Sequence, residues 1–242
     1  MTQYLVGFDR FIALDWANFA LELSLHTENE RANISNLKNW LVLKIPGKDA
    51  PRKTANVLTR LWLESNPEIE YFRNEARTIS LDTRKNDYVL FHWGMALLVF
   101  PFFRETCIQI GRLSALQSSI NRKAVHLRVA EKYSNQGTIP RSVDRIFQTL
   151  LDWELIKKIS QQEYVTTPRG TTDMNVKKWL LEAVTFSTPS KRVPLNDFYR
   201  LPELFPFGFN GETRQLVLET SQMKIERDGN NSEYIVWLPI KA

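Results

Sequence analysis

Residues 135–168 read NQGTIPRSVDRIFQTLLDWELIKKISQQEYVTTP, and this stretch decides the fold that we expect. Asn135, Gln136 and Gly137 form a turn signal. Thr138 is a residue type that caps helices. Pro140 suits a first helical position, because the N–H that proline lacks would be unpaired there anyway. We therefore predict that a helix begins next to Pro140.

The predicted helix is amphipathic. Its apolar residues fall at i, i+3, i+4, i+7 and i+8, which places them in one stripe. They are Val143, Ile146, Phe147, Leu150 and Leu151. The residues between them are polar or charged: Arg141, Ser142, Asp144, Arg145, Gln148 and Thr149. We expect this second set to form the outward face.

A short hairpin is predicted directly after this helix. Residues 155–159 (LIKKI) and 164–167 (YVTT) are strand-like, and a polar turn at 160–162 separates them. Helix, turn, polar-faced helix and hairpin in this order describe a winged helix-turn-helix. Such a module usually binds nucleic acid, with its second helix in the major groove.

The segment before the turn reads as a further helix with a basic surface. Leu113, Leu116, Ile120, Ala124 and Leu127 are spaced by 3, 4, 4 and 3 residues. Residues 104–158 hold ten Lys/Arg and five Asp/Glu, which equals the net charge of +5 of the whole chain. A local basic excess favours phosphate binding. Two other readings stay open, a solvated basic face and a winged helix that docks another protein.

A stretch in the first half resembles this module. Residues 47–64 (GKDAPRKTANVLTRLWLE) align with 137–153 when Pro51 is placed on Pro140, which puts Arg52 on Arg141. This pattern indicates a second helix-turn-helix or a distant duplication, or it is a chance match, since proline is common at the start of helices.

Three regions follow from these patterns. Residues 1–103 form a helical region with the candidate first helix-turn-helix. Residues 104–186 form the basic winged region, and 187–242 a Pro/aromatic segment with a C-terminal β-hairpin. Residues 88–103 (YVLFHWGMALLVFPFF) predict a central buried helix, too short to span a membrane. In the last region 216–218, 223–227 and 234–238 are strand candidates, and the composition shift near Pro189 suggests a removable extension.

Catalytic signals are missing from the sequence. Cys107 is the one cysteine, so an intramolecular disulfide is excluded and a reducing cytoplasm is expected. The three histidines lack metal-ligand spacing, and His92 reads as a hydrogen-bonded core residue. No signal peptide, phosphate-binding glycine loop or nucleophile motif is found. We expect a non-enzymatic chain without metal, cofactor, small-molecule substrate or membrane partner.

The fold class expected is mainly α, with one or two (winged) helix-turn-helix units and a small β-containing C-terminal extension. The expected partner is double-stranded DNA, with RNA as an open alternative. Other subunits of a larger complex are the competing partner, docked through the winged helix and the aromatic tail. The candidate DNA-binding residues are Arg141, Ser142, Arg145, Gln148, Thr149, Arg122, Lys123, Arg128, Lys157, Lys158, Arg52 and Lys53.

The order of these parts resembles BrxA, a small helical protein of BREX phage-defence systems. The matching parts are Ala50-Pro51-Arg52-Lys53-Thr54 with its helix, the apolar residues 88–103, Pro140-Arg141-Ser142 with its helix, and the wing through Thr167. The resemblance covers roughly residues 35–184 and departs in the longer N-terminal helix and in the tail after Ser187. It implies a non-catalytic DNA-binding accessory of an antiviral defence complex, acting beside larger enzyme subunits.

Overall fold

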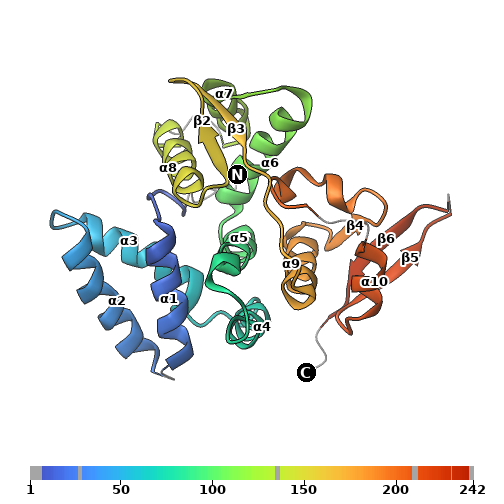
Figure 1. Cartoon of the computed structure of the whole chain (residues 1–242), viewed down its shortest axis with the longest axis horizontal. Helices are drawn as coiled ribbons and strands as arrows, with labels where there is room; N and C mark the ends of the chain where they lie inside the picture. The colour runs from blue at the N-terminus through green and yellow to red at the C-terminus, as the bar shows by residue number, and fades with distance from the viewer. Residues whose placement is uncertain (1–6, 27–28, 134–136, 209–211, 230, 240–242) are drawn as a thin grey trace.

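The structure, a computed structural model, describes residues 7–26, 29–133, 137–208, 212–229 and 231–239. Within these ranges it is mainly helical and has two small antiparallel sheets (Figure 1). This confirms the predicted mainly α fold with small β elements. The predicted turn residues Asn135 and Gln136 lie outside the described ranges.

All the secondary-structure elements described before residue 88 are helical. These are α1 (Leu14–His26), α2 (Glu30–Lys44), α3 (Ala50–Leu58), the π-helical turn η1 (Thr59–Leu63), α4 (Glu70–Ser80) and the 3-10 turn η2 (Lys85–Asp87). Pro51 lies in the first turn of α3, as the sequence predicts. Asn29 caps α2, because its side-chain oxygen accepts a hydrogen bond from the Ala32 N–H.

An apolar helix, α5 (Tyr88–Val99), lies at the centre of the molecule (Figure 1). It is buried nearly all round by α4, α6, α9 and η1. The sequence predicted one helix over 88–103, but the structure breaks it at Phe100. Pro101 explains the break: its ring disfavours helical backbone at the preceding residue, and Phe100 is extended. Pro101 instead begins the next helix, α6 (Pro101–Leu116).

His92 of α5 is a core residue, as expected from the sequence. Its Nδ1 accepts a hydrogen bond from Trp62 Nε1 at 3.1 Å, and its Nε2 lies 2.8 Å from Asn18 Oδ1. These partners fit a neutral ring that carries its proton on Nε2. Complete burial lowers the pKa of His92 to about 3.

The next elements form a compact group that we call the α6–β3 module. After α6 it contains β1 (Ile120–Asn121), α7 (Arg122–Tyr133), α8 (Ile139–Asp152), β2 (Ile156–Lys158) and β3 (Glu163–Thr166). The predicted helix through 113–127 is wrong, because its helical spacing runs across the end of α6 and the start of α7. Leu116 and Leu127, which the pattern placed in an apolar stripe, are 77% and 67% exposed.

The small sheet of this module has the strand order β1-β3-β2 and is antiparallel. Ile120 pairs with Tyr164, and Lys157 pairs with Val165. The β2–β3 pairing confirms the hairpin predicted over 155–167. The Tyr164 ring lies 4.8 Å from the Phe147 ring, centroid to centroid, which fastens the sheet to α8.

The last region begins with α9 (Met174–Ser187), which packs against α5. It continues with β4 (Arg192–Pro194), the 3-10 turns η3 (Phe198–Arg200) and η4 (Pro202–Leu204), α10 (Thr213–Leu218), β5 (Met223–Arg227) and β6 (Glu233–Trp237). The β5–β6 hairpin was predicted and is confirmed. The strand predicted at 216–218 is wrong: these residues are helical, and Leu216 and Val217 turn inward.

The tail after residue 187 is packed into the same core as the helices. Trp93 Nε1 donates a hydrogen bond to the Glu203 carbonyl at 3.0 Å, and Arg104 pairs with the Glu203 carboxylate at 2.6 Å. A Cβ at Gly111 would lie 2.0 Å from the Pro202 oxygen, so only glycine fits there. Trp237 packs on Phe72. The expectation of a removable extension is therefore at odds with how the tail docks.

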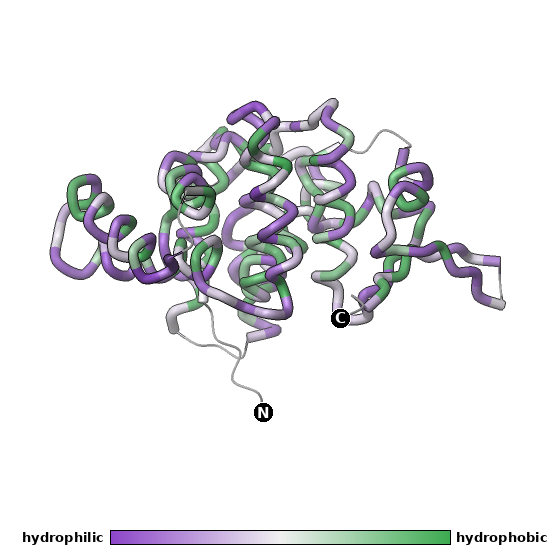
Figure 2. Tube along the Cα trace, turned by 90° about the horizontal axis from the view of Figure 1, so that it is seen from below, coloured by the Kyte–Doolittle hydropathy of each residue, from purple (hydrophilic) through white to green (hydrophobic). Residues whose placement is uncertain are grey.

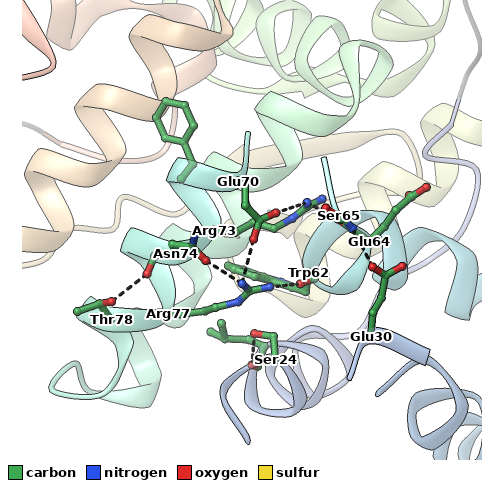
Figure 3. A network of polar contacts seen from close by, with 12 residues as sticks. Ser24, Glu30, Trp62, Glu64, Ser65, Glu70, Arg73, Asn74, Arg77 and Thr78 are labelled. Carbon is green, nitrogen blue, oxygen red and sulfur yellow. Dashed lines mark hydrogen bonds and ion pairs between the residues drawn. The ribbon is translucent and has the colours of Figure 1, made fainter. Parts of the chain in front are cut away.

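A buried arginine fixes the end of η1 (Figure 3). Arg73 of α4 is 1% exposed and donates to three main-chain carbonyls: Arg60 at 2.5 Å, Leu61 at 3.2 Å and Glu64. Because the last carbonyls of a helix lack partners within it, these bonds satisfy groups that would otherwise be buried unpaired. Glu70 adds an ion pair to Arg73 at 3.4 Å. The network ties η1 to α4.

Candidate nucleic-acid interface

Helix α8 has the two faces predicted from its sequence. Val143, Ile146, Phe147 and Leu150 are buried against the rest of the module. Arg141, Arg145 and Gln148 lie on the other side, spaced by 4 and 3 residues, so their side chains follow one outer face. Arg145 Nη1 donates to Gln148 Oε1 at 2.7 Å. These three residues define what we call the α8 face.

Ser142 and Thr149 are not part of this face, which corrects the sequence prediction. Ser142 is 2% exposed and Thr149 is completely buried. Thr149 Oγ1 accepts a hydrogen bond from the Ile12 N–H at 3.0 Å, so it anchors the N-terminal segment. Their spacing could have revealed this: they lie four residues before and three after Ile146, on the buried stripe. Neither hydroxyl can reach a ligand on the outer face.

The acidic residues beside the α8 face are held in contacts within the protein. Asp144 Oδ1 lies 3.4 Å from Arg122 Nη1 and 3.0 Å from His126 Nε2, both on α7. Asp152 Oδ1 accepts from the Leu14 N–H at 2.6 Å. Arg122, a candidate contact, thus neutralises Asp144, whereas Asp152 remains an exposed carboxylate at the C-terminal end of α8.

Helix α7 distributes its other cations over different sides. Lys123 is exposed in its first turn, next to the end of the helix that carries partial positive charge. Arg128 lies about 240° around the helix from Arg122, since each residue turns 100°. It lines a polar cleft of about 560 Å³ between α6 and α7, together with Arg112 and Lys132. The structure thus separates Arg128 from the α8 face.

The hairpin contributes two exposed lysines, Lys157 and Lys158, on its outer strand β2. Successive residues of a strand point to opposite faces, so the two ammonium groups do not form one cluster. Neither lysine forms an ion pair with another described residue. Both charges are therefore available to an outside partner.

The candidates Arg52 and Lys53 lie on a different pair of helices. Both are exposed on α3, which packs against α2 and not within the α6–β3 module. Arg52 lies 3.5 Å from Asp49, an exposed ion pair one helical turn away. No strand follows α3 before α4 in the described part of the chain. The first-half helices therefore lack the hairpin that the second half carries.

The described residues offer few side-chain groups for metal binding or nucleophilic catalysis. Among the described residues, no three His, Cys, Asp or Glu side chains are grouped so that they could hold a metal ion. Burial raises the pKa of the Cys107 thiol, which disfavours the reactive thiolate. No helix in the described ranges has the length and apolar character needed to cross a membrane.

Comparisons with known proteins give no family for this chain. No protein-family model, curated protein or solved structure matches it.

Proposed function

We propose that the chain binds duplex DNA through the α6–β3 module, acting as a winged helix-turn-helix. The support is the element order helix, strand, helix, helix, strand, strand, with the three strands arranged β1-β3-β2. In winged helix domains this arrangement leaves the last helix free on one side to enter the major groove. Helix α8 is that helix here.

The observation that carries the proposal is the composition of the α8 face. Arg141 is exposed and Arg145, one turn along, is half-buried, while the neighbouring Asp144 is paired with Arg122. Arginine can donate two hydrogen bonds to the major-groove edge of guanine, and glutamine can bond adenine. Arg141, Arg145 and Gln148 are therefore the groups we assign to base edges or to the flanking phosphates.

The surrounding lysines fit a different role. Lys123 precedes α8 on α7, and Lys157 and Lys158 lie on the hairpin. A lysine is a compact charge that binds phosphate without reading sequence. We assign these three residues to the sugar–phosphate backbone on either side of the groove. Such contacts supply affinity that falls as salt rises, because phosphate neutralisation releases counterions.

The broader role follows from the resemblance to BrxA. The proposal is a non-catalytic accessory of a bacterial phage-defence complex, which supplies DNA contact to larger enzyme subunits. The helix at 139–152 and the hairpin after it keep the order on which that resemblance rests.

A second candidate function is docking of another protein by the same module. It is favoured by three exposed apolar side chains, Leu116, Leu127 and Ile159, of which Ile159 is 59% exposed beside the hairpin turn. The aromatic tail, named in the sequence prediction as part of this docking surface, offers Tyr199, which is 48% exposed. Phe198, Phe207 and Trp237 are buried, so their rings are not available to a partner.

The test is a gel-shift titration of the full chain on a random-sequence duplex over a salt series. DNA binding predicts a measurable affinity whose logarithm falls linearly with the logarithm of salt concentration. Single-stranded RNA of matched length serves as the competitor and distinguishes the two nucleic acids. A chain that shifts neither nucleic acid at low salt would favour the protein-docking function.

A further inference from the structure

The highest positive charge density lies outside the α6–β3 module, on α2 and α3. Residues 31–60 contain seven Lys/Arg and one acidic residue, Asp49, a net charge of +6 against +5 for the whole chain. The flanking residues 1–30 and 61–103 carry −4 and −2. Residues 1–103 are therefore neutral as a whole, and the sum conceals a strongly basic segment.

All seven of these basic side chains are exposed. They are Arg31, Lys38, Lys44, Lys48, Arg52, Lys53 and Arg60. The one ion pair among the described residues of this segment is Arg52–Asp49, and both of its side chains are more than half exposed. An exposed ion pair of this kind has a small interaction free energy, so Arg52 can exchange Asp49 for a phosphate at little cost. In the α6–β3 module, by contrast, Arg104, Arg122 and Lys132 are all committed to carboxylates.

Helix α3 presents its cations as α8 does. Arg52 and Asn56 lie outward at a spacing of four residues, whereas the guanidinium of Arg60 in η1 packs 4.8 Å from the centroid of the Phe100 ring. Ala55 and Leu58 are buried on the other side. Lys44 is the last residue of α2, and Lys48 lies in the turn before α3. Lys44, Lys48, Arg52 and Lys53 define what we call the α3 face.

Helices α3 and α8 lie in the same part of the molecule and are linked through α1. Helix α1 packs against α2, α3 and η1. The residues just before and at its start, Ile12 and Leu14, hydrogen-bond to Thr149 and Asp152 of α8. Figure 1 accordingly draws α2 and α3 at the left edge with α8 above them. In Figure 2 the same end of the molecule carries hydrophilic positions on its outside.

We propose that the α3 face binds the sugar–phosphate backbone of the duplex at a second place, beyond the groove occupied by α8. The inference rests on the proposed function, because it extends the same partner. Duplex DNA fits this face because its phosphates form a regular row of negative charges, and the α3 face offers four cations with one compensating carboxylate. Because the contact is with the sugar–phosphate backbone, it increases the affinity and the number of base pairs covered, and it adds no preference for sequence.

The experiment compares two random duplexes of about 12 and 30 base pairs, the shorter only about one helical turn. The variant R52A/K53A removes two cations from the α3 face. The matched control R200A/K224A removes two exposed cations from the last region, each already paired with a nearby carboxylate. All four positions are exposed, and melting curves confirm that each variant is folded.

On the long duplex R52A/K53A is expected to lower the salt slope by about 1.8, since each lost phosphate contact contributes about 0.9. Extrapolated from 1 M to 0.1 M salt, that slope corresponds to roughly 60-fold weaker binding. On the short duplex, which the α8 face alone can hold, R52A/K53A should bind as the parent does. The control should change neither duplex by more than a fewfold.

Two results overturn the inference while leaving the proposed function in place. One is a folded R52A/K53A chain that binds the long duplex like the parent. The other is an equal loss on both lengths, which would make α3 part of a single site with α8. If the parent protein binds neither duplex, both the proposed function and this inference fail.

Discussion

Arg73 should be one of the most sensitive positions for stability in the chain. Replacing it with alanine leaves the carbonyls of Arg60, Leu61 and Glu64 without their donor and removes a buried side chain beneath α4. A buried group left unpaired costs about 1–3 kcal/mol, and breaking a buried, hydrogen-bonded charge costs about 3–5 kcal/mol in total. We expect Arg73→Ala to lower the free energy of unfolding by about 4 kcal/mol.

The assay is urea unfolding followed by circular dichroism, with a thermal scan beside it. For a chain of this size about 4 kcal/mol corresponds to a fall in Tm of roughly 8–16 °C. Arg73→Lys keeps the charge but has a single donor group, so its loss should be intermediate. The control Arg84→Ala removes a largely exposed arginine and should cost less than about 0.5 kcal/mol. An Arg73→Ala variant as stable as this control would refute the reasoning.

Two further predictions concern the core. Because the folded pKa of His92 lies near 3, below its unfolded value of about 6.5, its contribution to stability is complete above pH 6.5 and is lost as pH falls toward 3. Urea titrations at several pH values should show a dependence of up to about 1.4 kcal/mol per pH unit that H92Q flattens; identical slopes would contradict this. Truncation after Thr188 should yield a molten or insoluble chain, because the surfaces of Trp93 and Phe72 lose their cover. A sharp near-ultraviolet dichroism spectrum from the truncated chain would contradict it.

Sequence patterns predicted correctly those elements whose structure depends on residues close together in the chain. The stripe of α8 and the two hairpins are set by helical or alternating periodicity and by turn residues close at hand. Helical periodicity gave a wrong prediction at 113–127, because the spacing of apolar residues continues unchanged across the break between α6 and α7. The strand prediction at Val217 was wrong for another reason: the preference of valine for β-strands is overridden by the burial of α10 against α9.

Contacts between distant residues were beyond what the sequence could indicate. The helical spacing of Thr149 indicates that it is buried, but its hydrogen-bond partner Ile12, 137 residues away, could not be inferred from the sequence. The docking of Glu203 on Trp93 and Arg104 likewise joins segments about a hundred residues apart. In the candidate interface, Arg141 and Gln148 are exposed, as the helical spacing predicted, and Arg145 is half-buried. The internal use of Asp144 and Arg122 became evident only from the packing of α7 on α8.

The most direct test of the central claim is the DNA affinity of R141A/R145A. Both side chains lie on the α8 face, so the buried stripe of α8 is untouched and a melting curve should match that of the parent. On a random duplex over a salt series, we expect binding weaker by about 2–4 kcal/mol, roughly 30- to 1000-fold, than for the parent and the control R200A/K224A. A folded R141A/R145A chain that binds as tightly as the parent would contradict DNA binding through the α8 face.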